Sequence, residues 1–173
     1  MNRDKTRMTV LVTGGAGYIG SVTTAALIKE GHIVIVLDNL STGHREAVHP
    51  EAYFIKGDIS DKKIIENICR QHIDVVVHFA ACIEVQESVL NPSKYYGNNI
   101  CKTICFLDNL RKCGVNKTVF SSTAAVYGNP VSIPLTESAP LNPVNPYGWT
   151  KLLIEQVLKD YDHAYNCKSV ALR

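Results

Sequence analysis

Four glycines follow a short apolar segment near the start of the chain and limit what this region can become. Residues 10–13, Val-Leu-Val-Thr, are typical of a buried strand, and residues 19–30 have the pattern of a helix. The turn between them contains Gly14, Gly15, Gly17 and Gly20. Glycines let the backbone turn tightly and pass close to phosphate groups, and a helix start offers N–H groups without internal partners. A strand, a glycine turn and a helix in this order are typical of a pyrophosphate-binding site.

An acidic residue ends the next apolar segment. Residues 32–37 predict a second strand, and Asp38 follows it, eighteen residues after Gly20. A carboxylate at this place can accept hydrogen bonds from the ribose hydroxyls of NAD, and it would repel the additional phosphate of NADP. The sequence therefore predicts bound NAD. A plain strand–helix–strand unit without a ligand is the alternative interpretation.

Apolar strands and amphipathic helices alternate along the rest of the chain. Further strands are expected at residues 53–56, 75–80, 117–122 and 169–173, and helices at residues 60–72, 91–112 and 147–163. Continuously apolar strands that alternate with helices indicate a parallel sheet with helices on both faces, joined by right-handed crossovers. We therefore expect one doubly wound, Rossmann-like α/β domain over residues 1–173. The expected helix caps and stops are Ser60, Asn91, Asn145, Gly31 and Gly114.

Charge and cysteine content exclude several classes of partner. The chain has 18 basic and 16 acidic residues and a net charge of +2, which is too balanced for a nucleic-acid or membrane-binding surface. Its polar start is not followed by an apolar signal region, so we expect a cytoplasmic protein. The six cysteines form no C-x-x-C pair and no zinc pattern, so no metal site is expected.

The strongest catalytic pattern is Tyr147 and Lys151, which lie four residues apart in a predicted helix and so share one helix face. A tyrosine phenol has a pKa of about 10 and is a poor base at neutral pH, but a nearby ammonium group favours the phenolate. Thr123 follows a predicted strand, at the edge of the sheet where ligands bind. We expect Tyr147 to take a proton from a substrate hydroxyl while Thr123 hydrogen-bonds the same oxygen. A surface helix face is the alternative interpretation of the Tyr-x-x-x-Lys spacing.

Several stretches together resemble the extended short-chain dehydrogenase/reductase family, and within it the enzymes that epimerise UDP-hexoses. The matching stretches are VTGGAGYIGS, VLDNLSTG, GDI, VVHFAA, ESVLNPSKYYGNN, VFSSTAAVYG and NPYGWTK. The resemblance implies that oxidised NAD accepts hydride from C4 of a UDP-hexose while a tyrosine takes the hydroxyl proton. The 4-keto sugar then turns over and is reduced on its other face.

The resemblance also assigns roles by position. Tyr147 would be the base, Lys151 its partner and a ribose ligand, and Thr123 the hydroxyl that many relatives supply as serine. The implied cofactor contacts are Gly14, Gly17, Tyr18, Ile19 and Gly20 at the phosphates, Asp38 and Asn39 at the adenosine ribose, Asp58 and Ile59 at the adenine, Phe79, Ala80 and Ala81 on the nicotinamide side, and Asn98 nearby.

Two departures from the family pattern affect these expectations. Some relatives carry a lysine that touches the cofactor where this chain has Ile83. The sequence ends at Arg173, whereas family members continue for about as long again with the part that holds the uridine and sugar groups. We therefore expect these 173 residues to be the cofactor-binding half, to bind NAD weakly or not at all, and to show no turnover.

Three alternative hypotheses about the function and the oligomeric state remain. A UDP-glucuronate epimerase or decarboxylase would share most of the matching stretches, whereas a dehydratase is disfavoured because Ala124 and Ala125 stand where those enzymes have an acid pair. A non-catalytic NAD-binding module is the alternative from another class. In relatives, the helices matching residues 91–112 and 147–163 form a homodimer, and a monomer is the alternative here.

Overall fold

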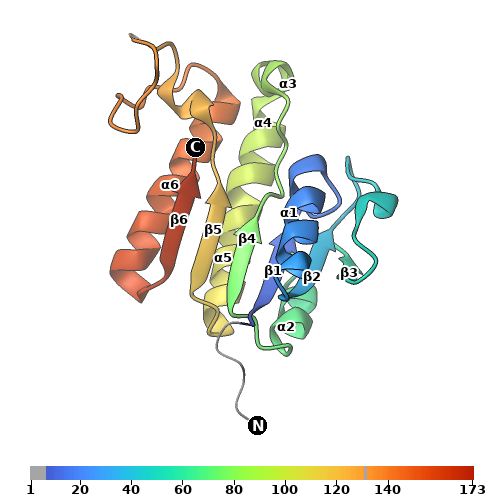
Figure 1. The fold of residues 1–173 in the computed structure, drawn as a ribbon. Helices are drawn as coiled ribbons and strands as arrows, with labels where there is room; N and C mark the ends of the chain where they lie inside the picture. Colours follow the sequence, from blue (N-terminus) through green and yellow to red (C-terminus); the bar gives the residue numbers. More distant parts are fainter. Residues whose placement is uncertain (1–6, 131) are drawn as a thin grey trace.

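A computed structural model describes residues 7–130 and 132–173 and shows one six-stranded parallel sheet (Figure 1). The strand order is β3-β2-β1-β4-β5-β6, which is that of a doubly wound nucleotide-binding sheet. The strands are β1 (Thr9–Thr13), β2 (Ile33–Asp38), β3 (Tyr53–Lys56), β4 (Val75–His78), β5 (Lys117–Ser121) and β6 (Lys168–Leu172). The predicted fold class is confirmed.

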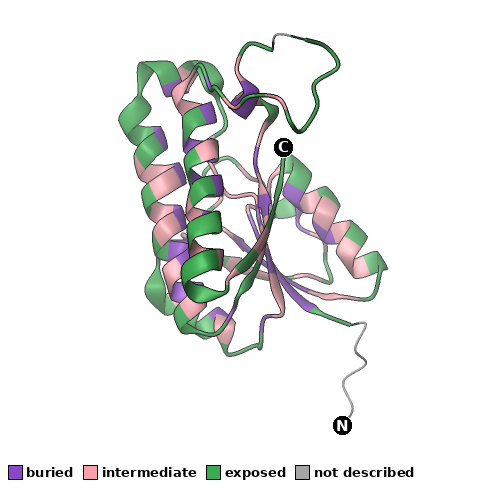
Figure 2. Cartoon of the chain, turned by 90° about the vertical axis from the view of Figure 1, so that its left-hand side faces the viewer, coloured by how far each residue is buried: buried purple, intermediate pink, exposed green. Residues whose placement is uncertain are grey.

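Helices cover the two faces of the sheet unequally. The helices are α1 (Tyr18–Lys29), α2 (Lys62–Cys69), α3 (Val85–Leu90), α4 (Pro92–Tyr95), α5 (Lys102–Lys112) and α6 (Pro146–Tyr165). Alternate residues of β1 point to opposite faces, so that Leu11 packs with α2 and α5 while Val10 and Val12 pack on the side of α1. Figure 2 shows that the helical layer is much larger on one side of the sheet than on the other. Both faces therefore have a core, and the α5–α6 side is the thicker layer.

The register of the strands brings their carboxyl ends to one edge of the sheet. Thr13 at the end of β1 is level with Leu37 and His78, and Ser121 at the end of β5 is level with Leu172. The segments that follow β1, β2, β4 and β5 therefore emerge side by side. Ligands of open parallel sheets bind at this edge.

Most of the predicted helix ends are correct. The side chains of Asn91 and Asn145 accept hydrogen bonds from the N–H groups of Lys94 and Gly148, at 3.3 and 2.8 Å. Gly31 and Gly114 have positive φ angles of 86° and 82° after α1 and α5. These glycines adopt the left-handed conformation that commonly ends a helix.

The predicted helix over residues 60–72 is shorter and is capped by another residue. Asp61 is the cap, because its Oδ1 accepts the N–H groups of Lys63 and Ile64 at 2.9 and 3.2 Å. The hydroxyl of Ser60 donates instead to Asp58. The helix ends at Cys69.

The predicted helix over residues 91–112 is not one regular helix. Its middle turn, Tyr96–Cys101, is π-helical and separates α4 from α5. The buried Asn99 of this turn accepts the N–H of Cys82 at 2.8 Å and donates to the carbonyl of Cys82 at 2.9 Å. These two hydrogen bonds tie the wider turn to the segment after β4. The short helix α3 in that segment was not predicted from the sequence. Such π-helical turns occur frequently at functional sites.

Candidate active site

The glycine turn is shaped by close backbone contacts. Gly14 has a φ of 70°, and a Cβ on it would lie 2.7 Å from the backbone nitrogen of Ala80. A Cβ on Gly20 would meet the carbonyl oxygen of Gly14 and would lie 2.7 Å from the Cα of Gly15. By contrast, a Cβ on Gly17 would have a single neighbour, at 3.4 Å. Gly14 and Gly20 therefore let the backbone fold tightly, while the outer side of the turn at Gly17 is open.

Helix α1 starts at this turn with no acidic residue in its first turn. Gly17 is the N-cap and has an extended backbone, and no side chain caps the helix. Tyr18 and Ile19 are 86% and 58% exposed, whereas Gly20 is buried against the turn. A helix start that has no side-chain cap and no acidic residue in its first turn suits a phosphate group.

Asp38 lies next to the glycine turn at the end of β2. Its carboxylate accepts the N–H of Ala16 at 3.0 Å and that of Leu40 at 2.8 Å. The exposed Asn39 follows, and its side chain donates to Asp58 at 3.4 Å. Two backbone hydrogen bonds thus fix the carboxylate of Asp38 beside the turn.

Asp58 is held by a lysine that the sequence analysis missed. Lys102, in the first turn of α5, forms an ion pair with Asp58 at 2.6 Å. Burial would raise the pKa of Asp58, but hydrogen bonds from Lys102 and Ser60 lower it to about 2. Ile59 is 7% exposed and packs in the core on the α2–α5 face. A contact of Ile59 with adenine would therefore come from its backbone.

The segment after β4 borders the same edge. The N–H of Phe79 donates to the carbonyl of Thr13 at 3.0 Å, and Ala80 lies against Gly14. Ala81 is half-buried. Asn98 of the π-helical turn is also half-buried and donates to Asn99 at 3.1 Å. The predicted nicotinamide-side residues thus line the end of β4, next to the turn.

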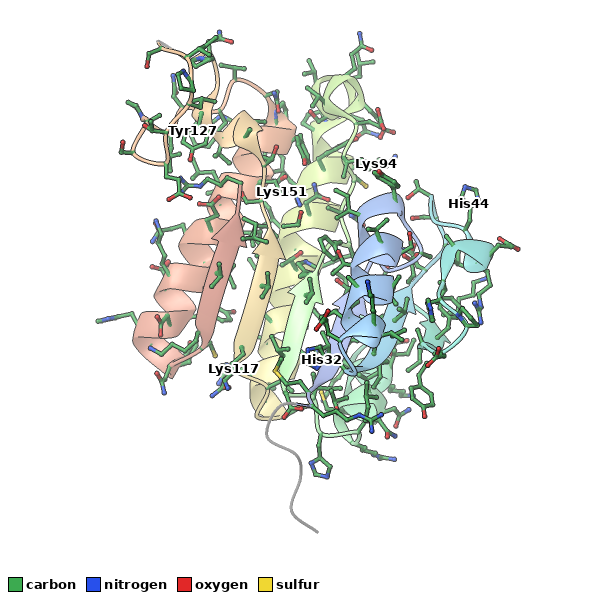
Figure 3. All side chains as sticks on the ribbon, in the orientation of Figure 1. His32, His44, Lys94, Lys117, Tyr127 and Lys151 are labelled. Carbon is green, nitrogen blue, oxygen red and sulfur yellow. The ribbon has the colours of Figure 1, made fainter. Side chains whose placement is uncertain are left out.

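Tyr147 and Lys151 share one face of α6, next to the end of β5. Figure 3 shows Lys151 and Tyr127 at the end of the sheet opposite to Lys117, where β5 begins. The Lys151 Nζ donates to the carbonyl of Ser121 at 2.7 Å and lies 5.9 Å from the centre of the Tyr147 ring. Thr123 follows two residues after Ser121, and its hydroxyl accepts the N–H of Ala125 at 3.1 Å. The structure therefore brings the three predicted catalytic residues to one edge.

Burial determines the proton affinity of Lys151. The residue is 4% exposed, and desolvation lowers its pKa to about 8. Since this value is above neutral pH, the side chain is mainly an ammonium group at pH 7. Lys151 therefore places a positive charge 5.9 Å from the centre of the Tyr147 ring, at a largely buried position.

Replacement of Lys151 by methionine is expected to stabilise the isolated chain by about 2 kcal/mol at pH 7. Lowering the pKa from 10.5 to about 8 opposes folding by about 3 kcal/mol, and the lost hydrogen bond to Ser121 offsets about 1 kcal/mol of the gain. The parent chain should become more stable as the pH rises from 8 to 10.5, because only the unfolded chain keeps its proton in this range. The advantage of the variant should shrink over the same range.

Urea unfolding at several pH values measures this difference. Lys56→Met, which changes an exposed lysine of β3, is the matched control and should alter stability by less than about 0.5 kcal/mol. A Lys151→Met chain that is less stable than the parent at pH 7 would show that burial of this ammonium does not oppose folding.

Two residues that were not predicted from the sequence position α6. The N–H of Tyr147 donates to the fully buried hydroxyl of Ser88 at 3.2 Å, so α3 supplies a second cap for α6. Asn99 donates to the hydroxyl of Thr150 at 3.2 Å and ties the π-helical turn to the same helix. The asparagine pair in YYGNN, inside a predicted helix, was the available signal for Asn99. Ser88 had no local signal, because its partner is 59 residues away.

A dinucleotide along this edge would extend from the glycine turn toward a tyrosine with a buried lysine beside it. Fold and site together define a dinucleotide-binding α/β protein with a tyrosine and a buried lysine at its binding edge. The chain belongs to the NAD dependent epimerase/dehydratase family, whose sequence model matches residues 10–173. This finding confirms the resemblance noted from the sequence and the predicted cofactor, NAD.

Individual relatives are close in sequence and structure. UDP-glucose 4-epimerase of Lactobacillus helveticus is 51% identical over 167 residues, which are 96% of this chain and 51% of that protein. UDP-glucose 4-epimerase of Brucella ovis, solved in complex with NAD, has a TM-score of 0.92 and 46% identity, over 96% of this chain and 51% of that one. The enzyme of Thermotoga maritima, solved with UDP-glucose, has a TM-score of 0.90 and 38% identity, over 96% and 55%. The chain spans about half the length of these relatives.

No helix within residues 7–130 and 132–173 is long and apolar enough to cross a membrane. In the same part of the chain, no three His, Cys, Asp or Glu side chains gather as metal ligands. The cytoplasmic location and the absence of a nucleic-acid partner stay predictions.

Proposed function

We propose that residues 1–173 form the NAD-binding domain of a UDP-glucose 4-epimerase, which interconverts UDP-galactose and UDP-glucose. The observation that carries this proposal is the placement of Tyr147, Lys151 and Thr123 at the edge of the sheet that also holds the glycine turn. A domain that only binds NAD needs neither a tyrosine base nor a buried lysine beside it. Several similar relatives are named UDP-glucose 4-epimerase.

Each catalytic side chain has a distinct part in this proposal. Tyr147 removes the proton of the C4 hydroxyl and later returns it, and the ammonium of Lys151 stabilises the phenolate in between. Thr123 hydrogen-bonds the same oxygen and keeps it next to Tyr147. Bound NAD supplies a reversible hydride acceptor at the sugar carbon. Because the proton and the hydride both return to the substrate, the net reaction changes only the configuration at C4.

The proposed cofactor contacts rest on how the shape and the hydrogen-bonding groups of this edge suit a dinucleotide. The open outer side of Gly17 and the uncapped start of α1 would receive the phosphates, with Gly14, Gly20, Tyr18 and Ile19 around them. The remaining proposed contacts are Asp38 and Asn39 at the adenosine ribose, Asp58 and Ile59 at the adenine, Phe79, Ala80 and Ala81 on the nicotinamide side, Asn98 nearby, and Lys151 at a ribose.

A related nucleotide-sugar reaction is the second candidate. A solved relative from Campylobacter jejuni, 43% identical with a TM-score of 0.90, is described as a UDP-Glc/GlcNAc 4-epimerase. That enzyme spans about twice the length of this chain, since the match covers 53% of it. A substrate panel containing UDP-galactose, UDP-N-acetylgalactosamine and UDP-glucuronate would separate the candidates.

We also propose a homodimer through α5 and α6. Trp149 and Leu153, four residues apart on α6, are 41% and 42% exposed, and Tyr96 before α5 is 38% exposed. Partly exposed large apolar side chains on one layer suit a helix–helix interface between two copies. Light scattering distinguishes a dimer from the 19.1 kDa monomer.

The cofactor part of the proposal is tested by titrating the labelled chain with NAD and following its amide NMR signals. We expect weak binding that shifts the signals of residues 14–20. Asp38→Ala should weaken NAD binding by about tenfold, since charged hydrogen bonds to the ribose contribute roughly 1.5 kcal/mol, and should reduce the preference over NADP. Glu51→Ala, an exposed acid in the loop before β3, is the control. An unchanged preference for NAD in Asp38→Ala would remove this residue from the ribose site.

A further inference from the structure

A buried carboxylate on α6 has no part in the proposed chemistry. Glu155 follows Lys151 by four residues and Tyr147 by eight, and it is 3% exposed. A carboxylate taken from water is costly unless donors surround it. Its partners therefore show what the structure gains by keeping an acid at this place.

Two donors from different segments satisfy Glu155. Its Oε1 accepts a hydrogen bond from the hydroxyl of Ser122, directly after β5. Arg173 approaches from the end of β6, with its Nη2 2.7 Å from Oε2 and its Nε 3.1 and 3.2 Å from the two oxygens. Burial raises the pKa of Glu155, but the hydrogen bonds from Arg173 and Ser122 outweigh burial and lower it. The residue is thus a carboxylate held in a fixed direction.

Arg173 also bonds to Tyr127, the last residue of the segment 122–127 that begins with Ser122. Its Nη1 donates to the hydroxyl of Tyr127 at 3.1 Å, and its guanidinium lies 5.3 Å from the centre of the Tyr127 ring. Tyr127 is 7% exposed and ends the short 3-10 helix of residues 124–127. Residues 122–127 are therefore bonded to Glu155 directly at one end, by Ser122, and through Arg173 at the other end, by Tyr127.

The tied segment contains Thr123. Its hydroxyl caps the 3-10 helix by accepting the N–H of Ala125. Helix α6 makes two further contacts here: Lys151 donates to the carbonyl of Ser121, just before this segment, and Gly148 packs closely against the carbonyl oxygen of Ala125 within it. The helix that carries Tyr147 and the segment that carries Thr123 are thus joined at several places.

We propose that Glu155 is a positioning residue, which with Ser122, Arg173 and Tyr127 forms a clamp that holds Thr123 in a fixed place relative to Tyr147. Only the use made of Thr123 rests on the proposed function. The clamp itself is a property of the fold and can be tested without turnover. It acts by fixing the backbone at both ends of residues 122–127, so that the hydroxyl of Thr123 needs little reorganisation to meet a substrate oxygen.

The test uses backbone order parameters of the whole chain from nitrogen-15 relaxation. In the parent chain, Thr123 and Ala124 should have values of about 0.85, typical of rigid backbone. Glu155→Gln keeps the shape but removes the charge, and should lower these values below about 0.6. Asp160→Asn removes an exposed acid of the same helix and should leave them near 0.85.

Two milder variants keep the test decisive if Glu155→Gln does not fold. Ser122→Ala leaves the pair of Glu155 and Arg173 intact, so it should loosen Thr123 while Tyr127 stays rigid. Tyr127→Phe should instead lower the order parameter of residue 127 while Thr123 stays rigid. Rigid order parameters at Thr123 in Glu155→Gln and Ser122→Ala, even with a lower urea midpoint, would overturn the clamp. NAD titration is read separately at residues 14–20, so a failure of the proposed function leaves this result unaffected.

Discussion

Turnover is expected to fall about 10²- to 10⁴-fold when Tyr147 is replaced by phenylalanine, the usual range for loss of a general base. The measurement needs a chimera in which residues 1–173 replace the matched half of the Lactobacillus helveticus enzyme, which is 51% identical over that region. The chimera should convert UDP-galactose to UDP-glucose. Tyr147→Phe removes only the hydroxyl, so the ring stays next to Lys151 and the N–H bond to Ser88 is kept.

Loss of the base is distinguishable from loss of the cofactor. NAD released by denaturing the purified chimera should be the same in amount for the parent and for Tyr147→Phe. Tyr53→Phe changes a tyrosine of β3 that is 67% exposed, and it should retain turnover within about twofold. A Tyr147→Phe chimera with at least a third of the parent rate would exclude this tyrosine as the base. An inactive parent chimera that binds NAD would instead favour the non-catalytic alternative.

The sheet and its binding edge were predictable because the signals for them are local. Continuous apolar runs such as residues 10–13 and 33–37 lie in strands covered on both faces, and these strands alternate with amphipathic helices. Given a parallel sheet, the residues after each strand must meet at one edge. Asp38 and Thr123 were therefore placed correctly at that edge from their positions after strands alone.

The details that were wrong or missed depend on competition and on distant partners. Ser60 and Asp61 could each cap α2 from the sequence; in the structure Asp61 accepts the N–H groups of the helix, and the hydroxyl of Ser60 donates to Asp58. A period of 3.6 residues cannot distinguish a regular turn from the π-helical turn at Asn99, whose amide bonds to Cys82. In the sequence, Glu155 is indistinguishable from an exposed acid of a helix. Only the fold places Arg173 2.7 Å from its carboxylate.

Gly20→Ala is expected to destabilise the chain by about 3 kcal/mol, a large part of the stability of a domain this size. The added methyl group would meet the backbone of Gly14 and Gly15, which cannot rotate away as a flexible side chain could. The same contact would push apart the glycine turn and the start of α1. Gly97→Ala is the matched control, because a Cβ there has open space and alanine favours helices, so stability should be unchanged or slightly higher.

Gly17→Ala separates the folding role of the turn from its binding role. A Cβ at this position makes only one contact, at 3.4 Å from the carbonyl oxygen of Gly14, so urea unfolding should resemble that of the parent chain. The methyl group would nevertheless occupy the open side of the turn, where we propose that the phosphates lie. We therefore expect the chimera carrying Gly17→Ala to fold but to lose most of its bound NAD. The two roles predict losses in different measurements. A Gly20→Ala chain with parent stability would contradict the close packing at Gly20, and a Gly17→Ala chimera with parent NAD content would contradict the phosphate site at Gly17.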